Sequence, residues 1–181
     1  MEFVAIAISG AFEVRHEMRS DARGRFKRQY CEQEFAAAGL NTHWVHVNHS
    51  VTLGLGSVRG MHFQHPPHAE AKLVGCTLGR AFDVAVDLRR GSPSFLRWAA
   101  VEIGEGRSFY IPEGCAHGFQ ALSQEVHLAY MHSAPYAPQA EGGVRFDDPA
   151  LGIAWPLPIG TVSDRDRSFA LIDANFEGLS I

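Results

Sequence analysis

Ionisable side chains occupy positions in this chain where a β-strand ordinarily carries apolar ones. His62 lies between apolar residues in an alternating segment, and Lys72 follows it after one short connection. A further histidine, His117, ends the run Pro-Glu-Gly-Cys-Ala-His. Because alternate side chains of a strand share a face, His62 and Lys72 could reach one cavity. Neither is cheap to bury without a partner, so the pattern predicts acid/base chemistry on a β scaffold.

A base and a cation together could remove a proton beside a ketone. Such a hydrogen can be removed when a base lies against it and the developing enolate oxygen is stabilised by a positive or hydrogen-bonding group. His62 offers the base and Lys72 the cation. Each also has a structural interpretation, because strand histidines are commonly satisfied core residues and edge lysines guard sheets against strand addition.

Short segments rich in β-branched or aromatic residues must position these side chains, and turn signals such as Leu-Gly-Arg at 78–80 separate them. Residues 81–88 alternate most clearly, with Phe, Val, Val and Leu on one side and Ala, Asp, Ala and Asp on the other. This predicts a sheet with one strongly apolar face. The predicted strands are residues 42–48, 58–64, 72–78, 81–88, 96–103, 108–111, 119–122 and 126–132, which favour an all-β sandwich or barrel.

One helix is predicted over residues 31–38. Glu32 and Glu34 lie near its positive N-terminal end, and Gly39 is placed to cap its C-terminus. Residues 147–158 are typical of an ordered irregular segment. No linker, repeat or low-complexity tract interrupts the sequence, so residues 1–181 are expected to form a single domain.

Composition limits the function classes. The chain has 181 residues, 46% of them hydrophobic, and its formal charge of −4 provides no global basic field to recruit nucleic acid or membrane. Any anion site must therefore be local. Three cysteines without zinc-ribbon spacing favour a reducing compartment over a disulfide framework. The first eight residues carry an acid at position two and too short an apolar run for a signal peptide, which predicts a cytoplasmic protein.

Five motifs, in order, resemble those of the dTDP-4-dehydrorhamnose 3,5-epimerase family. The resemblance implies a cupin-type jelly roll with a few short helices. It also implies a homodimer whose subunits exchange strands, and epimerisation of a nucleotide-linked 4-keto-6-deoxy sugar, at C3, C5 or both, without metal or organic cofactor. The motifs are Arg-Gly-Met-His-Phe-Gln at 59–64, the segment 82–93, Ile-Pro-Glu-Gly-Cys-Ala-His-Gly-Phe at 111–119, the segment 147–156 and Ser-Asp-Arg-Asp-Arg at 163–167.

The resemblance also assigns catalytic roles to four residues. His62 is the base and Lys72 the cation beside the ketone. Epimerisation further requires a proton donor on the opposite face of the sugar ring, and the matching position is Tyr130. Asp166 is implied to pair with His62, fixing its tautomer and stabilising the imidazolium. Without the resemblance, Tyr130 would be interpreted as an aromatic at a barrel rim and Asp166 as a surface charge.

Substrate contacts implied by the resemblance are partly rewritten in this chain. Arg23 and Arg59 fit diphosphate contacts, for which arginine is a suitable bidentate partner. The family usually has a base-stacking phenylalanine where this chain has Arg19, and an acid that hydrogen-bonds the base where it has Arg28. It also tends to have Gln-Asp where this chain has His-Val at 46–47. The remaining predicted substrate-binding residues are Asn48, Gln64, His117 and Tyr136.

Two other classes of function remain open from the sequence. A metal-dependent cupin enzyme is one, because His62, His65, His68 and Glu70 lie close together and His117 follows in a second segment. Metal cupins usually carry His-x-His, however, and here two prolines at 66–67 break the strand where further ligands would be needed. The other is a sugar-binding cupin that kept the fold and lost catalysis. The ligand spacing favours an epimerase without a metal.

Overall fold

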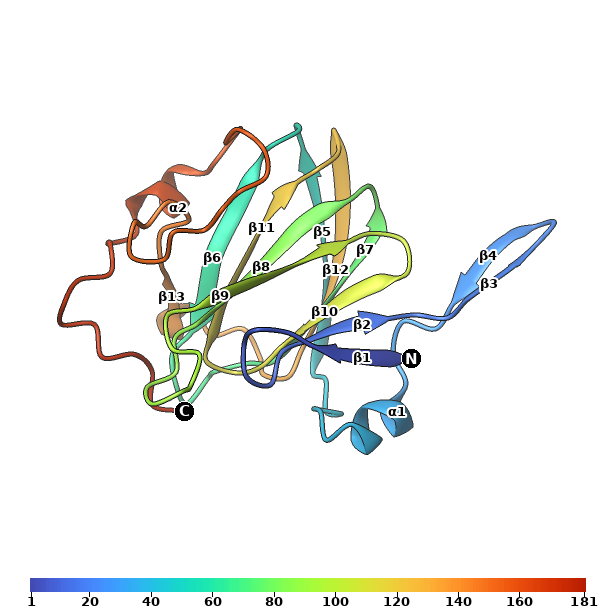
Figure 1. The fold of residues 1–181 in the computed structure, drawn as a ribbon, viewed down its shortest axis with the longest axis horizontal. Helices are drawn as coiled ribbons and strands as arrows, with labels where there is room; N and C mark the ends of the chain where they lie inside the picture. Colours follow the sequence, from blue (N-terminus) through green and yellow to red (C-terminus); the bar gives the residue numbers. More distant parts are fainter.

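Two antiparallel sheets packed face to face form the body of the protein, as the computed structural model of residues 1–181 shows (Figure 1). The larger one, called the large sheet below, has six strands in the order β1-β2-β10-β7-β12-β5. Its strands are β1 (Glu2–Ala5), β2 (Phe12–Arg15), β10 (Arg107–Ile111), β7 (Lys72–Leu78), β12 (Glu125–His132) and β5 (His46–Leu53).

The second sheet, called the small sheet, has five strands in the order β13-β6-β11-β8-β9. Its strands are β13 (Glu141–Gly143), β6 (Val58–Gln64), β11 (Cys115–Ala121), β8 (Ala81–Asp87) and β9 (Trp98–Ile103). Consecutive strands repeatedly cross from one sheet to the other, as β5 to β6 and β7 to β8 do, which is the connectivity of a jelly roll.

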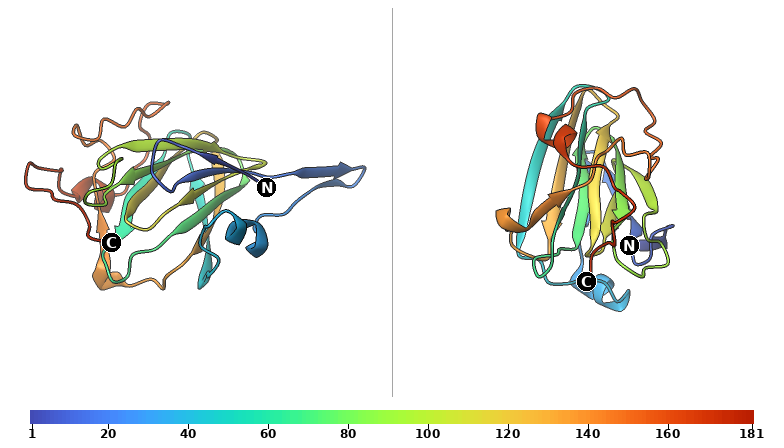
Figure 2. Two further views of the ribbon diagram at one scale, coloured as in Figure 1. Left: turned by 60° about the horizontal axis from the view of Figure 1, so that its bottom comes forward. Right: turned by 90° about the vertical axis from the view of Figure 1, so that its left-hand side faces the viewer.

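A separate hairpin of β3 (Met18–Asp21) and β4 (Gly24–Lys27) projects away from this body, as two views agree (Figures 1 and 2). It pairs with neither sheet. The helical elements are short: α1 (Glu32–Ala37), the 3₁₀ turn η1 (Pro138–Ala140) and α2 (Asp164–Ser168). None of the helices is long and apolar enough to cross a membrane.

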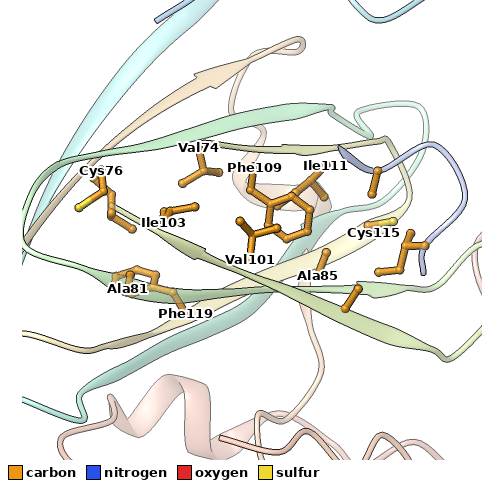
Figure 3. Close-up of a cluster of buried hydrophobic side chains, with 14 of the residues drawn as sticks. Val74, Cys76, Ala81, Ala85, Val101, Ile103, Phe109, Ile111, Cys115 and Phe119 are labelled. Atoms are coloured by element: carbon orange, nitrogen blue, oxygen red, sulfur yellow. The ribbon is translucent and has the colours of Figure 1, made fainter. Parts of the chain in front are cut away.

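The main core lies between the two sheets (Figure 3). Phe109 and Ile111 from the large sheet face Val101 and Ile103 from β9, and all four are buried. Small side chains such as Ala85 fill the space where strands approach closely. Close packing of this kind leaves the two sheets rigidly related, which a site built from both of them requires.

Part of the outer face of each sheet is covered as well, while Val47, Val51 and Leu53 of β5 in the large sheet stay exposed. Phe35 of α1 is fully buried against the large sheet, beside Leu73 and Tyr110. On the small sheet, the C-terminal part of the chain lies over β8, where Val84 and Val86 pack with residues such as Leu151 and Leu179. The strongly apolar face predicted for β8 therefore points outward and is sealed by the C-terminal segment. Its other face, with Ala81, Asp83, Ala85 and Asp87, is the one turned toward the interior.

The all-β jelly-roll prediction is confirmed, and the predicted strands 58–64 and 72–78 match β6 and β7. The predicted helix 31–38 matches α1, whose N-cap is Cys31. Two strand predictions are wrong by four residues or more at a bound, and the others differ by at most two. Residues 42–45 precede β5, with Trp44 packed on the aromatic cluster under α1, and β11 already begins at Cys115. The strands β1 to β4 and β13 and the helix α2 are additional to the prediction.

Candidate functional site

A cavity of about 250 Å³ opens between the sheets, and strands of both sheets contribute to its wall. The small sheet supplies His62, Gln64 and His117, and the large sheet supplies Lys72 and Tyr130. The cavity therefore gathers side chains that the sequence placed on separate strands. The predicted site residues that line it are Asn48, Arg59, His62, Gln64, Lys72, His117, Tyr130 and Tyr136.

His62 is paired with Asp166, as the family resemblance implied. Its Nε2 lies 2.7 Å from Asp166 Oδ1, across 104 residues of sequence. The carboxylate can only accept, so Nε2 carries the hydrogen and Nδ1 remains to take up a proton. The His62 side chain is 33% exposed while that of Asp166 is 5% exposed, so the imidazole is accessible and its carboxylate partner is not.

Asp166 is held from three sides. The backbone N–H of Gly60 donates to its second oxygen at 3.0 Å, and Ser163 caps the first turn of α2 by accepting from the Asp166 N–H. Burial alone would raise the pKa of Asp166, but the hydrogen bonds from His62 and Gly60 lower it. Asp166 is therefore a charged, fixed partner for the imidazole.

Gly60 makes this approach possible. A Cβ at this position would lie 2.5 Å from the Gly118 Cα of the neighbouring strand, and Gly60 has a φ of +123°. Only glycine fits such a close backbone contact at this φ. The Arg-Gly-Met-His motif thus lets β6 approach β11 closely and present the Gly60 N–H to Asp166.

Lys72 is almost fully buried in the cavity wall, with 7% of its side chain exposed. Its ammonium donates to Glu70 Oε1 at 3.2 Å and reaches the carbonyl oxygen of His62 at 3.5 Å. Glu70 also accepts from His132 Nδ1 at 2.9 Å. The interpretation of Lys72 as a solvated edge residue is therefore wrong, since β7 is an inner strand between β10 and β12.

His117, which lines the cavity, forms a second histidine–carboxylate pair. Its Nε2 lies 2.6 Å from Asp83 Oδ1, and both side chains are buried. The other Asp83 oxygen has no hydrogen-bond partner. Burial raises the pKa of Asp83 despite the opposing charge of His117. The Pro-Glu-Gly-Cys-Ala-His turn thus delivers a histidine whose ring is already anchored.

Tyr130 faces the cavity from β12 in the large sheet. Its hydroxyl lies 3.0 Å from Ser50 Oγ, and its ring packs edge-on against His117 at 5.9 Å between centroids. Burial raises the pKa of the Tyr130 hydroxyl, so the phenol carries its proton at neutral pH. A protonated hydroxyl in a cavity wall can donate that proton to a neighbouring carbanion or enolate.

Residues at the rim differ in how far their polar groups are already hydrogen-bonded within the protein. Arg59 is exposed and makes only long contacts, to Thr52 Oγ1 at 3.3 Å and the Val51 carbonyl at 3.5 Å. The Gln64 amide is committed to the backbone, accepting from the Ala137 N–H at 2.6 Å. Tyr136 is 58% exposed and donates to Glu141, whose other oxygen pairs with Arg165 of α2.

Arg19, Arg23 and Arg28 do not line the cavity. They lie on or directly beside the projecting hairpin, which points away from the two sheets (Figures 1 and 2). Arg23 pairs with Asp21 at 2.7 Å and its side chain is 90% exposed. Within one chain, the residues predicted to bind the nucleotide are therefore split between two separate places.

Five residues of the site were not predicted from the sequence as epimerase residues. Four of them pair with residues that were predicted, and the fifth, His132, holds Glu70. One sequence signal exists for Asp83, because it is an acid among alanines on the inward face of β8. The Ser50–Tyr130 and Glu70–His132 contacts span 80 and 62 residues, which is too far for local pattern to reveal. These residues are Ser50, Glu70, Asp83, His132 and Glu141.

The geometry does not favour the metal-dependent alternative. The structure contains no group of three or more His, Cys, Asp or Glu side chains that could hold a metal ion. The three cysteines are free thiols, two of them buried.

Comparison with known proteins gives one consistent result. A sequence model of the dTDP-4-dehydrorhamnose 3,5-epimerase family matches residues 5–174. The chain is 42% identical to the dTDP-4-dehydrorhamnose 3,5-epimerase of Mycolicibacterium smegmatis, over 96% of this chain and 88% of that protein. It is 39% identical to the dTDP-4-dehydrorhamnose 3-epimerase of Streptomyces niveus, over 95% and 84%. Its fold matches a dTDP-6-deoxy-D-glucose-3,5-epimerase of Legionella pneumophila, solved in complex with dTDP-4-keto-L-rhamnose, with a TM-score of 0.91, 32% identity and coverage of 99% and 98%.

Proposed function

This chain belongs to the dTDP-4-dehydrorhamnose 3,5-epimerase family of isomerases, and we propose that it epimerises a dTDP-linked 4-keto-6-deoxy sugar by moving protons between His62, Tyr130 and the carbons beside the ketone. The observation that carries the proposal is the His62–Asp166 pair in the cavity wall, 2.7 Å apart. A partly exposed imidazole with a buried carboxylate behind it is the arrangement of a general base.

His62 begins the reaction by taking the proton from a carbon next to the ketone. The imidazolium that forms is stabilised by the charged Asp166, which keeps its place through Gly60 and Ser163. The electrons of the broken C–H bond move onto the ketone oxygen and give an enolate. Lys72, with one N–H left for the cavity after its bonds to Glu70 and the His62 carbonyl, stabilises that oxygen.

Tyr130 completes the inversion by returning a proton to the opposite face of the sugar ring. His62 and Tyr130 come from different sheets, so they approach the cavity from opposite walls. A planar enolate held between them can be deprotonated on one face and protonated on the other. The raised pKa of Tyr130 keeps its proton available at neutral pH.

The nucleotide part of the substrate requires contacts that one chain does not provide in one place. Arg59 at the rim is available to a diphosphate, because its present contacts are long. Arg23 is exposed on the hairpin, which projects away from the two sheets, and it does not line its own cavity. We therefore include a homodimer in the proposal, in which the hairpin of one subunit reaches the cavity of the other and adds Arg23, Arg19 and Arg28 to the nucleotide site.

The experiment that tests the two-face mechanism is Tyr130→Phe, followed by proton NMR in deuterium oxide with a dTDP-4-keto-6-deoxyhexose. Abstraction and return by His62 survive in this variant, so solvent deuterium should still enter the sugar while inversion falls by about a hundredfold. Loss of signal from the hydrogens at C3 and C5 reports abstraction at each carbon, and coupling constants report inversion.

Tyr110→Phe is the matched control, because Tyr110 is a buried tyrosine outside the cavity. It should leave both quantities unchanged. Parallel loss of exchange and inversion in Tyr130→Phe would make Tyr130 a residue that positions the ketone rather than the acid. Absence of any exchange in the parent protein would favour a sugar-binding role without catalysis.

A further inference from the structure

Glu70 binds two side chains of the cavity wall, Lys72 and His132, that are far apart in the sequence. It lies two residues before Lys72 and 62 residues before His132. One carboxylate oxygen accepts from Lys72 Nζ at 3.2 Å, and the other accepts from His132 Nδ1 at 2.9 Å. Neither the family match nor the mechanism above assigns it a role.

All three members of this cluster are enclosed. The exposed fractions of the side chains are 8% for Glu70, 7% for Lys72 and 12% for His132. Burial alone would raise the pKa of Glu70, but the hydrogen bond from His132 and the charge of Lys72 lower it. Glu70 is therefore a buried anion, and removing one partner of such a group is costly.

His132 keeps Glu70 in place. Because a carboxylate only accepts hydrogen bonds, His132 Nδ1 must carry the hydrogen. The His132 ring is fixed by two neighbours, with its centroid 4.6 Å from that of His46 and 6.2 Å from that of Tyr130. The Glu70 carboxylate is thus anchored independently of Lys72.

Asp83 is a second carboxylate whose charge interacts with that of Lys72. One oxygen of Asp83 is buried and has no hydrogen bond, and the charge of Lys72 is among those that oppose the raised pKa of Asp83. A lysine has a flexible four-carbon stem, and an unsatisfied buried carboxylate attracts it strongly. Without Glu70, the ammonium would move toward Asp83 and away from the ketone.

We propose that Glu70, anchored by His132, is a positioning residue that holds the Lys72 ammonium at the cavity wall and keeps it from pairing with Asp83. This inference rests on the proposed role of Lys72 at the ketone oxygen. It adds the cause of that placement. The carboxylates of Glu70 and Asp83 compete for Lys72, and Glu70, which is fixed by His132, determines where the ammonium lies.

Glu70→Ala tests the proposal through kinetics. The kcat for solvent exchange of a dTDP-4-keto-6-deoxyhexose should fall at least about tenfold, since small displacements of a catalytic group can cost about a hundredfold. KM should stay within about twofold, because Glu70 touches no nucleotide contact. Glu70→Gln keeps an oxygen for Lys72 and should lose less. Glu125→Gln is the control, since Glu125 pairs with His127 at 2.8 Å on the same strand as His132 but outside the cavity.

A crystal structure of Glu70→Ala supplies a readout independent of activity. Lys72 Nζ should lie within hydrogen-bond distance of the free Asp83 oxygen. An unmoved ammonium, an unchanged kcat or a loss confined to KM would each overturn the inference while leaving the proposed function intact. A parent protein that exchanges no hydrogen would instead remove the proposed function itself. If melting curves show that Glu70→Ala does not fold, His132→Asn tests the same anchor, with a smaller loss in kcat expected.

Discussion

Two Asp-x-Arg pairs in this chain share one local geometry and have opposite surroundings. In the body, the N–H of Arg89 donates to Asp87 at 3.0 Å and its guanidinium donates at 2.8 Å. In the hairpin, Arg23 makes the same two bonds to Asp21 at 2.8 and 2.7 Å. The Asp87 side chain is 0% exposed and that of Asp21 is 55% exposed.

Burial therefore determines whether an Asp-x-Arg pair stabilises the fold or leaves its arginine available to a ligand. Ser92 and Ser94 also donate to Asp87, so its carboxylate is saturated and the pair is part of the fold. Arg23 has only Asp21 and water, and it can exchange that carboxylate for a phosphate at little cost. The two halves of the proposed site differ in the same way. The cavity half is assembled within one chain, and the hairpin half presents arginines that are paired only with solvent-accessible carboxylates.

The largest expected effect is on stability. Asp87→Ala should lower the free energy of unfolding by about 3 kcal/mol, because it leaves Arg89 without its buried partner. Asp21→Ala is the matched change in the hairpin and should leave the urea midpoint unchanged. Equal losses in the two variants would contradict the distinction between the pairs.

The Asp87 contribution also has a defined pH dependence. Burial would raise the pKa of Asp87, but its hydrogen bonds, led by that from Arg89, lower it from 3.8 to about 2. A lowered folded-state pKa stabilises the protein above the unfolded value. This stability is lost as pH falls from about 4 toward 2.

The next largest effect is the loss of the base. His62→Ala should reduce exchange of the sugar hydrogens with solvent by about a hundredfold or more, while affinity for dTDP stays within about twofold. The cavity half would then no longer catalyse exchange, while the hairpin half would still bind the nucleotide. Exchange at the parent rate, followed by NMR, would remove His62 from the mechanism.

Asp166→Asn should slow exchange by about tenfold to a hundredfold, the equivalent of a hydrogen bond to a charged group. The amide keeps a hydrogen bond but cannot stabilise the imidazolium, and a melting curve should show that the protein stays folded. Asp164→Asn is the control, since Asp164 lies exposed in the first turn of the same helix. If Asp166→Asn left the exchange rate unchanged and Asp164→Asn lowered it, the assignment of Asp166 as the functional partner of His62 would be wrong.

The smallest effects concern the two arginines. Arg59→Ala in the cavity and Arg23→Ala in the hairpin should each weaken binding of the nucleotide sugar at least about tenfold in titration calorimetry. Unchanged affinity in both variants would place the diphosphate elsewhere.

Arg23 also allows a test of subunit exchange. If each cavity uses the partner's hairpin, a mixed dimer of Arg23→Ala and His62→Ala chains contains one intact site. Equal mixing should then recover about a quarter of the parent activity at low substrate concentration. No recovery on mixing would mean that each chain uses its own hairpin.

Sequence pattern predicts best where a short apolar segment is bounded by clear turn signals. The bounds of β6 and β7 follow in this way, although residues on both faces of these strands are buried. The hairpin escapes prediction because Met18–Asp21 and Gly24–Lys27 are largely exposed and mostly polar, so no alternation marks them. The direction of the apolar face of β8 also escapes it, because only tertiary packing decides which layer covers that face.

The carboxylates of the site are the other gap. Asp83 meets His117 across 34 residues, and the Glu70–His132 bond spans 62. The local sequence around these acids is typical of solvated charges, and only the crossing of strands between the two sheets brings them to their partners. Asp166 was predicted because a family resemblance carries long-range pairing that local periodicity does not.

His62 and Asp166 are separated in time as well as in sequence. A ribosome adds roughly 5 to 20 residues per second, so the 104 residues between them take roughly 5 to 20 seconds to synthesise. Every strand of both sheets precedes Asp166 in the chain. The sheets can therefore assemble while the histidine still lacks its carboxylate. A chain released early would carry the cavity without the carboxylate that pairs with His62, so this pair is the last part of the proposed site to form.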